Sequence, residues 1–448
     1  MKRTVPSIRN TVPASLIARS KPLLAIVLLF VSGCRKFDDT NLNSPSLNGL
    51  LENATVAELN NLVTGTEAQL RADMAFFIDA VGIVGREHYR FSNSDPRYVT
   101  DLLGAGSTVL DPNAFYITNP WGARYRCIRN ANILIASADN SSFVTGAQRQ
   151  GYHAFAKTIT AYQLLLALDL TYDNGIRIGV SDPDHLGPIV SRPEALTAIM
   201  DLLNTAKADL DDPDTEFAFA LSPGFTGVDD PTGFLRFNRA LAARVAIYQE
   251  HWSEARDLLD ESFLDMNGDL RTGAYMVYSA LTSDQLNDLY LPTNASGEVR
   301  LAHPSFAEDI EAGDDRIDKT PLRNDTLTQA DLTSDRDVAV YTSNTDPVPI
   351  ITNEELVLIH AEADIHLMNI GDAVSAIDVI RTAHGLAAYS GGTSEQELIE
   401  ELLVQRRYSL FFEGHRWVDL RRYDRLGDLP IDRPDDDIWA QFPIPFAE

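Results

Sequence analysis

Helical periodicity is the feature that most limits how this 448-residue chain can fold. Apolar residues recur at spacings of three and four over residues 120–138, 151–170 and 193–210, which places them on one face of a helix. Hydrophobic residues make up 44% of the chain, enough to build a sizeable core between such faces. The sequence therefore predicts a mainly α-helical fold.

Residues 238–262 and 354–384 each have the pattern of two helices joined by a turn. In the first pair, Ala242 and Ala246 are small residues that would let a neighbouring helix approach closely. In the second pair we expect Gly371-Asp372 to turn the chain. Both segments resemble tetratricopeptide repeats, in which stacked helix pairs bury a continuous core.

A further helix is expected over about 394–412, because Ser394 and Glu397 have the spacing of a capping box. Long irregular stretches rich in Pro, Gly, Asp and Asn separate the helical segments, and only short strands are expected in them, for example around 337–341. Loops of this length in a helical domain usually carry function. The irregular stretches are 86–119, 173–192, 211–236, 263–350 and 423–448.

The N-terminus has the parts of a bacterial lipoprotein signal. A basic region is followed by the apolar run 23–31, which is too short to span a bilayer, and then by Val31-Ser32-Gly33-Cys34. This tetrapeptide resembles a lipobox, so we expect residues 1–33 to be removed and Cys34 to be acylated. Cys127 would then be the only free cysteine, in a helical pattern that predicts a buried, inert thiol. Residues 34–48 read as a polar tether and 49–448 as a single domain.

The charge balance argues against nucleic-acid binding. The chain has 65 Asp+Glu and 37 Lys+Arg, for a net charge of −28. Such a surface repels phosphate backbones, and it also disfavours attachment to an anionic membrane by charge. Because the acids are spread along the chain, a solvated surface suited to high salt is preferred to a cation-binding face.

Motifs for catalysis and for metal binding are weak. His360 and His366 are six positions apart on a helix, so they lie on different faces and cannot share an ion without distortion. Residues 265–269 begin like a calcium loop, but Leu270 and Met276 stand where the loop needs Gly and Glu. A turn is therefore expected at 265–269, and neither a metal nor a cofactor is expected.

The C-terminal part of the chain resembles the SusD/RagB family. The resemblance is strongest over 347–422 and rests on the helix pattern at 354–363 and on the Arg-Arg…Phe-Phe-Glu-Gly-His-Arg-Trp…Asp-Leu-Arg-Arg run within 405–422. Residues 121–132 and 313–316 resemble two further family elements. At Gln405 and Ser409 the family usually has Glu, which puts a family salt bridge in doubt here.

The resemblance implies an α-helical fold of four tetratricopeptide-like helix pairs that support a loop-rich face. It also implies a surface-exposed lipoprotein of the outer membrane. Such a protein binds an oligosaccharide or a peptide and delivers it to a SusC-like TonB-dependent transporter, without catalysis. Two alternatives are a tetratricopeptide-type scaffold that binds only proteins and, less favoured, a secreted hydrolase.

The most typical family residues are interpreted as structural. Mixed Arg, Glu and aromatic residues suggest partly buried ion pairs and stacking that lock the C-terminal helix. An acid/base pair of Glu413 and His415 would need a nucleophile or a cofactor that the sequence does not offer. The structural set is Trp121, Arg406, Arg407, Glu413, Gly414, Arg416, Trp417 and Asp419.

We place the ligand face on the loops of 86–119, with help from 275–290. Their aromatic residues show no helical period and stand among Asn, Asp and Arg, so rings could stack on a ligand while polar groups bond to it. The alternative is that the rings pin the loops to the helical core. The candidates are Tyr89, Phe91, Asn93, Arg97, Tyr98, Tyr116, Tyr278 and Tyr290, and the second stretch also contains Tyr275.

Overall fold

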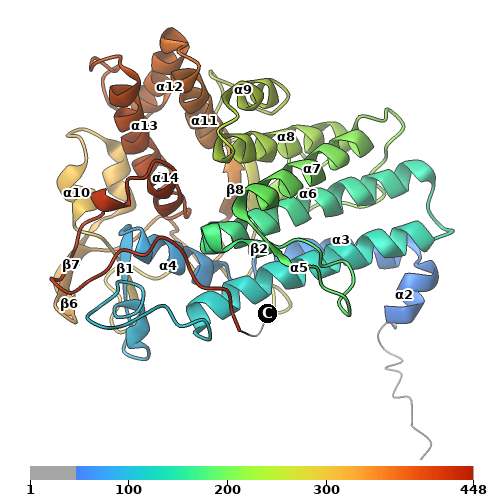
Figure 1. Ribbon diagram of the computed structural model, residues 1–448, viewed down its shortest axis with the longest axis horizontal. Coiled ribbons are helices and arrows are strands. Elements are labelled where there is room, and N and C mark those ends of the chain that lie inside the picture. Colours follow the sequence, from blue (N-terminus) through green and yellow to red (C-terminus); the bar gives the residue numbers. More distant parts are fainter. Residues whose placement is uncertain (1–46, 447–448) are drawn as a thin grey trace, which may run out of the picture. The chain divides into compact units, whose positions relative to one another are not determined.

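The computed structural model describes residues 47–446 (Figure 1). The predicted signal sequence, Cys34 and the tether up to residue 46 lie outside the described residues. The chain divides into two compact units, residues 1–49 and 50–448, and of the first unit only residues 47–49 are described. Helix α2 (Leu47–Asn53) crosses the boundary, and all later elements belong to the second unit.

The second unit is mainly helical, which confirms the predicted fold class. Helices α5 to α8 run side by side in Figure 1, and α11, α12 and α13 stand steeply to α8. Helix α9 packs on both α8 and α11, so it connects the two groups. The helices are α3 (Val56–Gln69), α4 (Met74–Val84), α5 (Phe115–Asn140), α6 (Gly146–Thr171), α7 (Arg192–Leu210), α8 (Pro231–Tyr248), α9 (Trp252–Asp260), α10 (Ser305–Asp309), α11 (Asn353–His366), α12 (Ile370–Ala383), α13 (Glu395–Ser409) and α14 (Arg416–Arg422).

Capping boxes start several of these helices. The predicted one at Ser394 is present: its hydroxyl accepts from the Glu397 amide at 3.4 Å, and the Glu397 carboxylate accepts from the Ser394 amide at 3.1 Å. Thr55 and Thr145 cap α3 and α6 in the same way. Each cap satisfies amide groups that the first helical turn leaves unpaired and contributes about 1 kcal/mol.

The strands form four separate antiparallel pairs: β1 (His88–Phe91) with β5 (Val299–Ala302), β2 (Ile176–Arg177) with β3 (Ile189–Val190), β4 (Gly273–Met276) with β8 (Val348–Thr352), and β6 (Leu322–Gln329) with β7 (Leu332–Arg336). The prediction of a strand around 337–341 is wrong. Asp337 makes one isolated bridge with Leu301. The next two amides then bond to carbonyls of different segments, Val338 to Arg300 and Ala339 to Lys319, so no ladder forms.

Two predicted boundaries also differ from the structure. Gly371-Asp372 lies in the first turn of α12, and the chain turns before it, at Leu367–Asn369, where Met368 has a φ of +60°. Helix α13 ends at Ser409 instead of continuing to 412, because the following turn places Phe412 at a φ of +67°. Helices α3 and α4 had no counterpart among the predicted elements.

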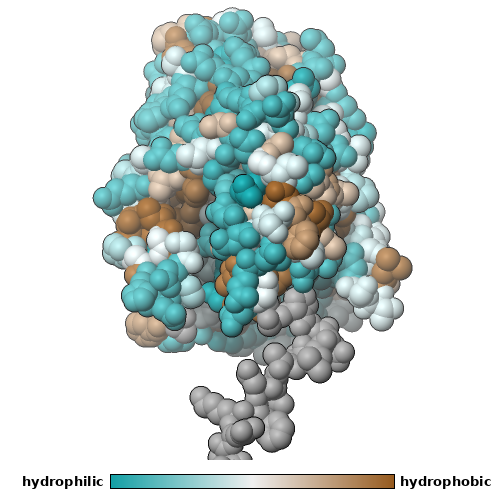
Figure 2. Space-filling model, turned by 90° about the vertical axis from the view of Figure 1, so that its right-hand side faces the viewer, coloured by the Kyte–Doolittle hydropathy of each residue, from teal (hydrophilic) through white to brown (hydrophobic). Residues whose placement is uncertain are grey.

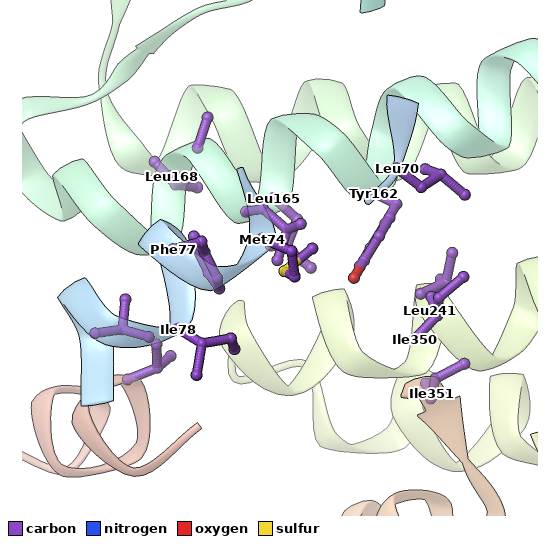
Figure 3. Packing of buried hydrophobic residues seen from close by; sticks show 14 of the residues in the cluster. Leu70, Met74, Phe77, Ile78, Tyr162, Leu165, Leu168, Leu241, Ile350 and Ile351 are labelled. Atoms are coloured by element: carbon purple, nitrogen blue, oxygen red, sulfur yellow. The ribbon is translucent and has the colours of Figure 1, made fainter. Parts of the chain in front are cut away.

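The core lies where α4, α6, α8 and β8 meet. Figure 3 shows Phe77 and Ile78 of α4 near Leu165 and Leu168 of α6, with Leu241 of α8 on the other side. The predicted close helix contact in the first repeat-like pair is present: both Ala242 and Ala246 are fully buried.

The surface is mostly polar. Figure 2 shows one face on which hydrophilic residues dominate and apolar ones form small separate groups. Over residues 47–446, no helix has the length and apolar character needed to cross a membrane.

Candidate ligand-binding groove

Two cavities lie beside the junction of α3 and α4, with volumes of about 430 Å³ and about 210 Å³. Arg71, between the two helices, lines both of them. The opposite walls come from the turn 220–225, from β4, and from the loop 277–289 that follows it. We call these two cavities the Arg71 groove.

Arg71 holds the loop against the helix junction. Its Nη1 donates to the Val277 carbonyl at 2.7 Å and lies 2.7 Å from the Asp284 carboxylate. Its guanidinium carbon is 5.6 Å from the centre of the Tyr278 ring, within range of a cation–π contact. The side chain is 11% exposed, so these contacts position it within the groove instead of leaving it in bulk water.

Glu67 and Ser222 supply polar groups to the larger cavity. The Glu67 carboxylate accepts from the Ser222 amide at 3.2 and 3.3 Å, and burial raises the pKa of Glu67. The buried Ser222 Oγ has no hydrogen bond of good geometry to a described residue, although it lies close enough to the Glu67 carboxylate to lower the pKa of that group. This hydroxyl is therefore a hydrogen-bonding group that a ligand or a water molecule can satisfy.

Aromatic rings and apolar side chains complete the walls. Tyr275 and Phe76 are half-buried, while Tyr278 is 9% exposed. The Tyr275 hydroxyl donates to the Arg271 carbonyl, and burial raises the pKa of Tyr275 to about 12, so the ring stays neutral. Leu281 and Leu286 are 72% and 43% exposed, and they line the larger and the smaller cavity respectively.

This arrangement suits a ligand with both apolar faces and hydrogen-bonding groups. The larger cavity falls in the size range of small-molecule sites, and apolar walls with a few fixed polar groups are typical of them. Ring faces can pack on the CH groups of a ligand, while Arg71, Glu67 and Ser222 can bond to its polar atoms. The groove thus combines the two features expected of the ligand face.

Four of the predicted ring residues lie in the core. Tyr89 and Phe91 sit on β1, stacked on one another at 5.8 Å and 3–4% exposed. Tyr98 is 5% exposed between Phe115 and Arg90. Tyr116 is 1% exposed, and its hydroxyl bonds to Asp101 and to the Asp111 amide. These four rings line neither cavity of the groove and are buried among other side chains, so they pin the loop to the core, as the alternative interpretation has it.

The remaining candidates are divided. Asn93 is exposed. Arg97 is paired with Asp95 at 2.6 Å. Tyr290 is half-buried and packs against the core. Tyr275 and Tyr278 line the Arg71 groove, so of the two predicted stretches 275–290 contributes rings to it and 86–119 does not.

Sequence reasoning did not identify Arg71, Phe76 or Asp284. Phe76 belongs to the apolar run of α4, which reads only as a buried helix. Arg71 and Asp284 are 213 positions apart, and no local pattern relates them. Only the tertiary packing of the loop 277–289 against α4 makes them a pair.

The C-terminal family residues form a buried network of ion pairs. Arg406 donates to the Asp419 carboxylate at 2.7 Å, and Arg422 bonds to Asp419 at 3.0 Å and to Glu362 at 2.7 Å. Trp417 is fully buried and donates to the Trp439 carbonyl at 2.8 Å. These contacts tie α11, α13 and α14 to the C-terminal segment.

Gln405 and Ser409 bond to an arginine, although neither side chain carries a charge. Both accept hydrogen bonds from the buried Arg316, at 2.7 and 2.9 Å, and Arg316 pairs with the Asp314 carboxylate at 2.6 Å. The segment 313–316 is therefore docked on α13 through the two positions where the chain departs from the family pattern. One carboxylate already balances Arg316, so neutral acceptors suffice there.

The residues of the weak metal and catalytic motifs bond to neighbouring protein groups. His360 faces Asp364 at 3.0 Å, whereas His366 stacks on Trp252 at 3.9 Å, so the two histidines have separate partners. The Asp265 carboxylate accepts from the Asn267 amide, which forms the predicted turn.

Burial lowers the pKa of His415 to about 4 and raises that of Glu413. His415 lies 3.9 Å from Glu355.

Comparison with known proteins agrees with the sequence resemblance. Residues 327–442 match the model of the SusD family, and they include both the β6–β7 hairpin and the C-terminal network. This C-terminal part of the chain is therefore similar to the SusD family. No curated protein matches the chain.

Solved structures share the SusD-like fold. A SusD superfamily protein from Bacteroides vulgatus aligns with a TM-score of 0.66 at 15% identity, covering 88% of this chain and 96% of its own. Surface glycan-binding protein A from Bacteroides uniformis aligns with a TM-score of 0.60 at 14% identity, covering 83% and 88%. NanU from B. fragilis aligns with 0.59 at 14% identity, covering 82% and 89%. At these identities the likeness establishes the fold.

Proposed function

We propose that this SusD-like protein binds a glycan in the Arg71 groove. The observation that carries the proposal is the groove itself, where Phe76, Tyr275 and Tyr278 stand beside the polar groups of Arg71 and Glu67. Sugars need both kinds of group, because their CH faces pack on rings while their hydroxyls need hydrogen-bond partners. A structural relative named as a glycan-binding protein supports the choice of a glycan over a peptide.

We further propose that the protein is an outer-membrane lipoprotein, anchored through Cys34 and facing outward, that passes its ligand to a SusC-like TonB-dependent transporter. The lipobox-like tetrapeptide Val31–Cys34 and the match of residues 327–442 to the SusD family support this assignment. A groove walled by a surface loop such as 277–289 suits transfer, because modest contacts on a loop allow the ligand to leave again.

Glycan binding is tested by calorimetry of the purified protein against a panel of oligosaccharides. Tyr275→Ala removes a ring of the groove and should weaken binding of the oligosaccharide that binds wild type by about tenfold. Losing the apolar contact of a half-covered ring costs roughly 1–2 kcal/mol, and about 1.4 kcal/mol corresponds to a tenfold change in affinity. Tyr389→Ala is the matched control, because Tyr389 is also half-buried but lies outside the groove. Equal affinities of wild type and Tyr275→Ala would place the site elsewhere.

A further inference from the structure

A separate pocket lies on the C-terminal part of the fold. It has a volume of about 400 Å³ and is bounded by α13, α14 and the 3₁₀ turn η5 (Leu426–Asp428). The side chains of Arg407, Arg416 and Arg425 line it. It shares no lining residue with the Arg71 groove. We call it the Arg416 pocket.

Arg416 carries an incompletely balanced charge. Its Nε donates to the Gly85 carbonyl at 3.1 Å, and no described residue accepts a hydrogen bond from its two terminal nitrogens. Burial, together with the like charge of Arg407, lowers the pKa of Arg416 to about 10. Glu87 attracts Arg416 but lies beyond ion-pair distance, and burial raises the pKa of Glu87 to about 7. The pocket therefore presents guanidinium N–H groups that lack an anion.

The other two arginines are held at the walls. Arg407 donates to Asp309 at 2.8 Å and to the Ser305 hydroxyl at 2.7 Å. Arg425 uses only its Nε, which donates to Asp428 at 2.6 Å, so its terminal nitrogens are also without a described acceptor. Both side chains are thereby fixed near Arg416, and Arg425 adds donors for the same anion.

The remaining lining is amphipathic. Leu403, Val404 and Leu420 form an apolar wall, and Val404 is 41% exposed. Four carboxylates also line the pocket: Asp309 and Asp419 are paired with arginines, and Glu400 and Asp428 are exposed. These carboxylates repel a large polyanion but accept hydrogen bonds from hydroxyl groups. The pocket thus favours one compact anionic group on a body that has both hydroxyls and CH surface.

We propose that the Arg416 pocket is a second binding site, one that takes a carboxylate borne on a hydroxyl-rich ring, which is the chemistry of a sugar acid. Arg416 receives the carboxylate through its planar pair of N–H groups, a geometry that matches carboxylate oxygens. Glu400 and Asp428 accept from ring hydroxyls, and the CH face of the ring packs on Leu403 and Val404. The site stands independently of glycan binding in the Arg71 groove.

Glucuronate, glucose and acetate are the probes, titrated into the purified full-length protein and followed by ligand-observed NMR at low salt. Glucuronate should bind, glucose should not bind measurably, and acetate should bind at least about tenfold more weakly than glucuronate because it lacks the hydroxyls and the ring. Added salt should weaken glucuronate binding, since the attraction is between charges.

Val404→Glu places a carboxylate in the pocket without touching the core, and Val109→Glu, the same change at a valine that is 69% exposed and lies outside the pocket, is its control. We expect about tenfold weaker glucuronate binding for Val404→Glu and for Arg425→Gln. Wild-type binding is expected for Val109→Glu and for the groove variant Tyr275→Ala. Equal binding of glucuronate by Val404→Glu and wild type would overturn the proposal. So would equal affinities for acetate and glucuronate, or binding of an acidic peptide in place of glucuronate. Thermal unfolding checks that each variant is folded.

Discussion

Asp169 should make the stability of the protein fall as pH rises. This carboxyl is 9% exposed near the end of α6 and lines an internal cavity of about 30 Å³ together with Tyr162, Arg244 and Glu413. Figure 3 shows Tyr162 pointing from α6 into the interior. Burial raises the pKa of Asp169 from 3.8 to about 7, and the attraction of Arg421 and other arginines only partly offsets it.

The sign follows from proton uptake. The folded pKa of Asp169 is above the unfolded value, so between about pH 4 and pH 7 the folded state keeps a proton that the unfolded state releases. Its contribution to stability is complete below pH 3.8 and is lost as pH rises through about 7. A difference of about three pKa units corresponds to roughly 4 kcal/mol, a large share of the 5–15 kcal/mol typical of a folded domain.

Asp169→Asn removes this dependence, because an amide does not ionise. The free energy of unfolding of the variant minus that of wild type should rise by roughly 4 kcal/mol between about pH 4 and about pH 8. Urea unfolding followed by tryptophan fluorescence at several pH values measures this difference. Asp201→Asn, the same change at an exposed position of α7, is the control. A difference between Asp169→Asn and wild type that stays flat, or that falls with pH, would refute the reasoning.

Four further predictions concern the anchor, the transporter, the helix pairs and the C-terminal turn. Cys34→Ala should release the protein from the membrane fraction, and unchanged fractionation with an intact N-terminal Met would contradict lipidation. Mild detergent extraction should co-purify a large β-barrel transporter over an interface above ~1,000 Å², whereas crosslinking that yields only monomer would argue against it. Ala246→Trp should overpack α8 and lower the unfolding free energy by roughly 1–3 kcal/mol or more, and a wild-type melting temperature would count against the buried contact. Gly414→Ala should lower it by about 1–3 kcal/mol, because Gly414 has a φ of +89° and an added Cβ would lie 3.0 Å from Val81 Cγ2; equal stability to wild type would show that the turn can relax.

Much of the helical fold could be predicted from local pattern. The segments 120–138, 151–170 and 193–210 all lie within helices, and the capping box at Ser394 starts α13 where its spacing predicted. These features depend on residues within a few turns of each other, so the chain specifies them without tertiary context. The positive φ of Met368 and of Phe412 could not be read in this way, because neither is a residue type that marks a left-handed turn.

Only some residues of the candidate site could be predicted from the sequence. The stretch 86–119 was predicted to be irregular, but Tyr89 lies on β1 and Tyr116 in the first turn of α5. Tyr98 and Tyr116 could not be assigned to the core or to the surface, since rings serve both purposes. Tyr278 differs from them only in lying opposite Arg71, a residue 207 positions earlier in the chain.

The sequence by itself determined the helices over 120–138, 151–170 and 193–210, the repeat-like pairs and the resemblance of the C-terminal part to the SusD family, because each depends on residues close together along the chain. The tertiary structure alone decided which charges and rings meet. Asp169 acquires its raised pKa, Arg71 its place between two cavities, and Arg416 its unbalanced charge only when distant segments exclude water around them. Desolvation depends on everything that packs around a group, so it cannot be inferred from the neighbours of that group in sequence.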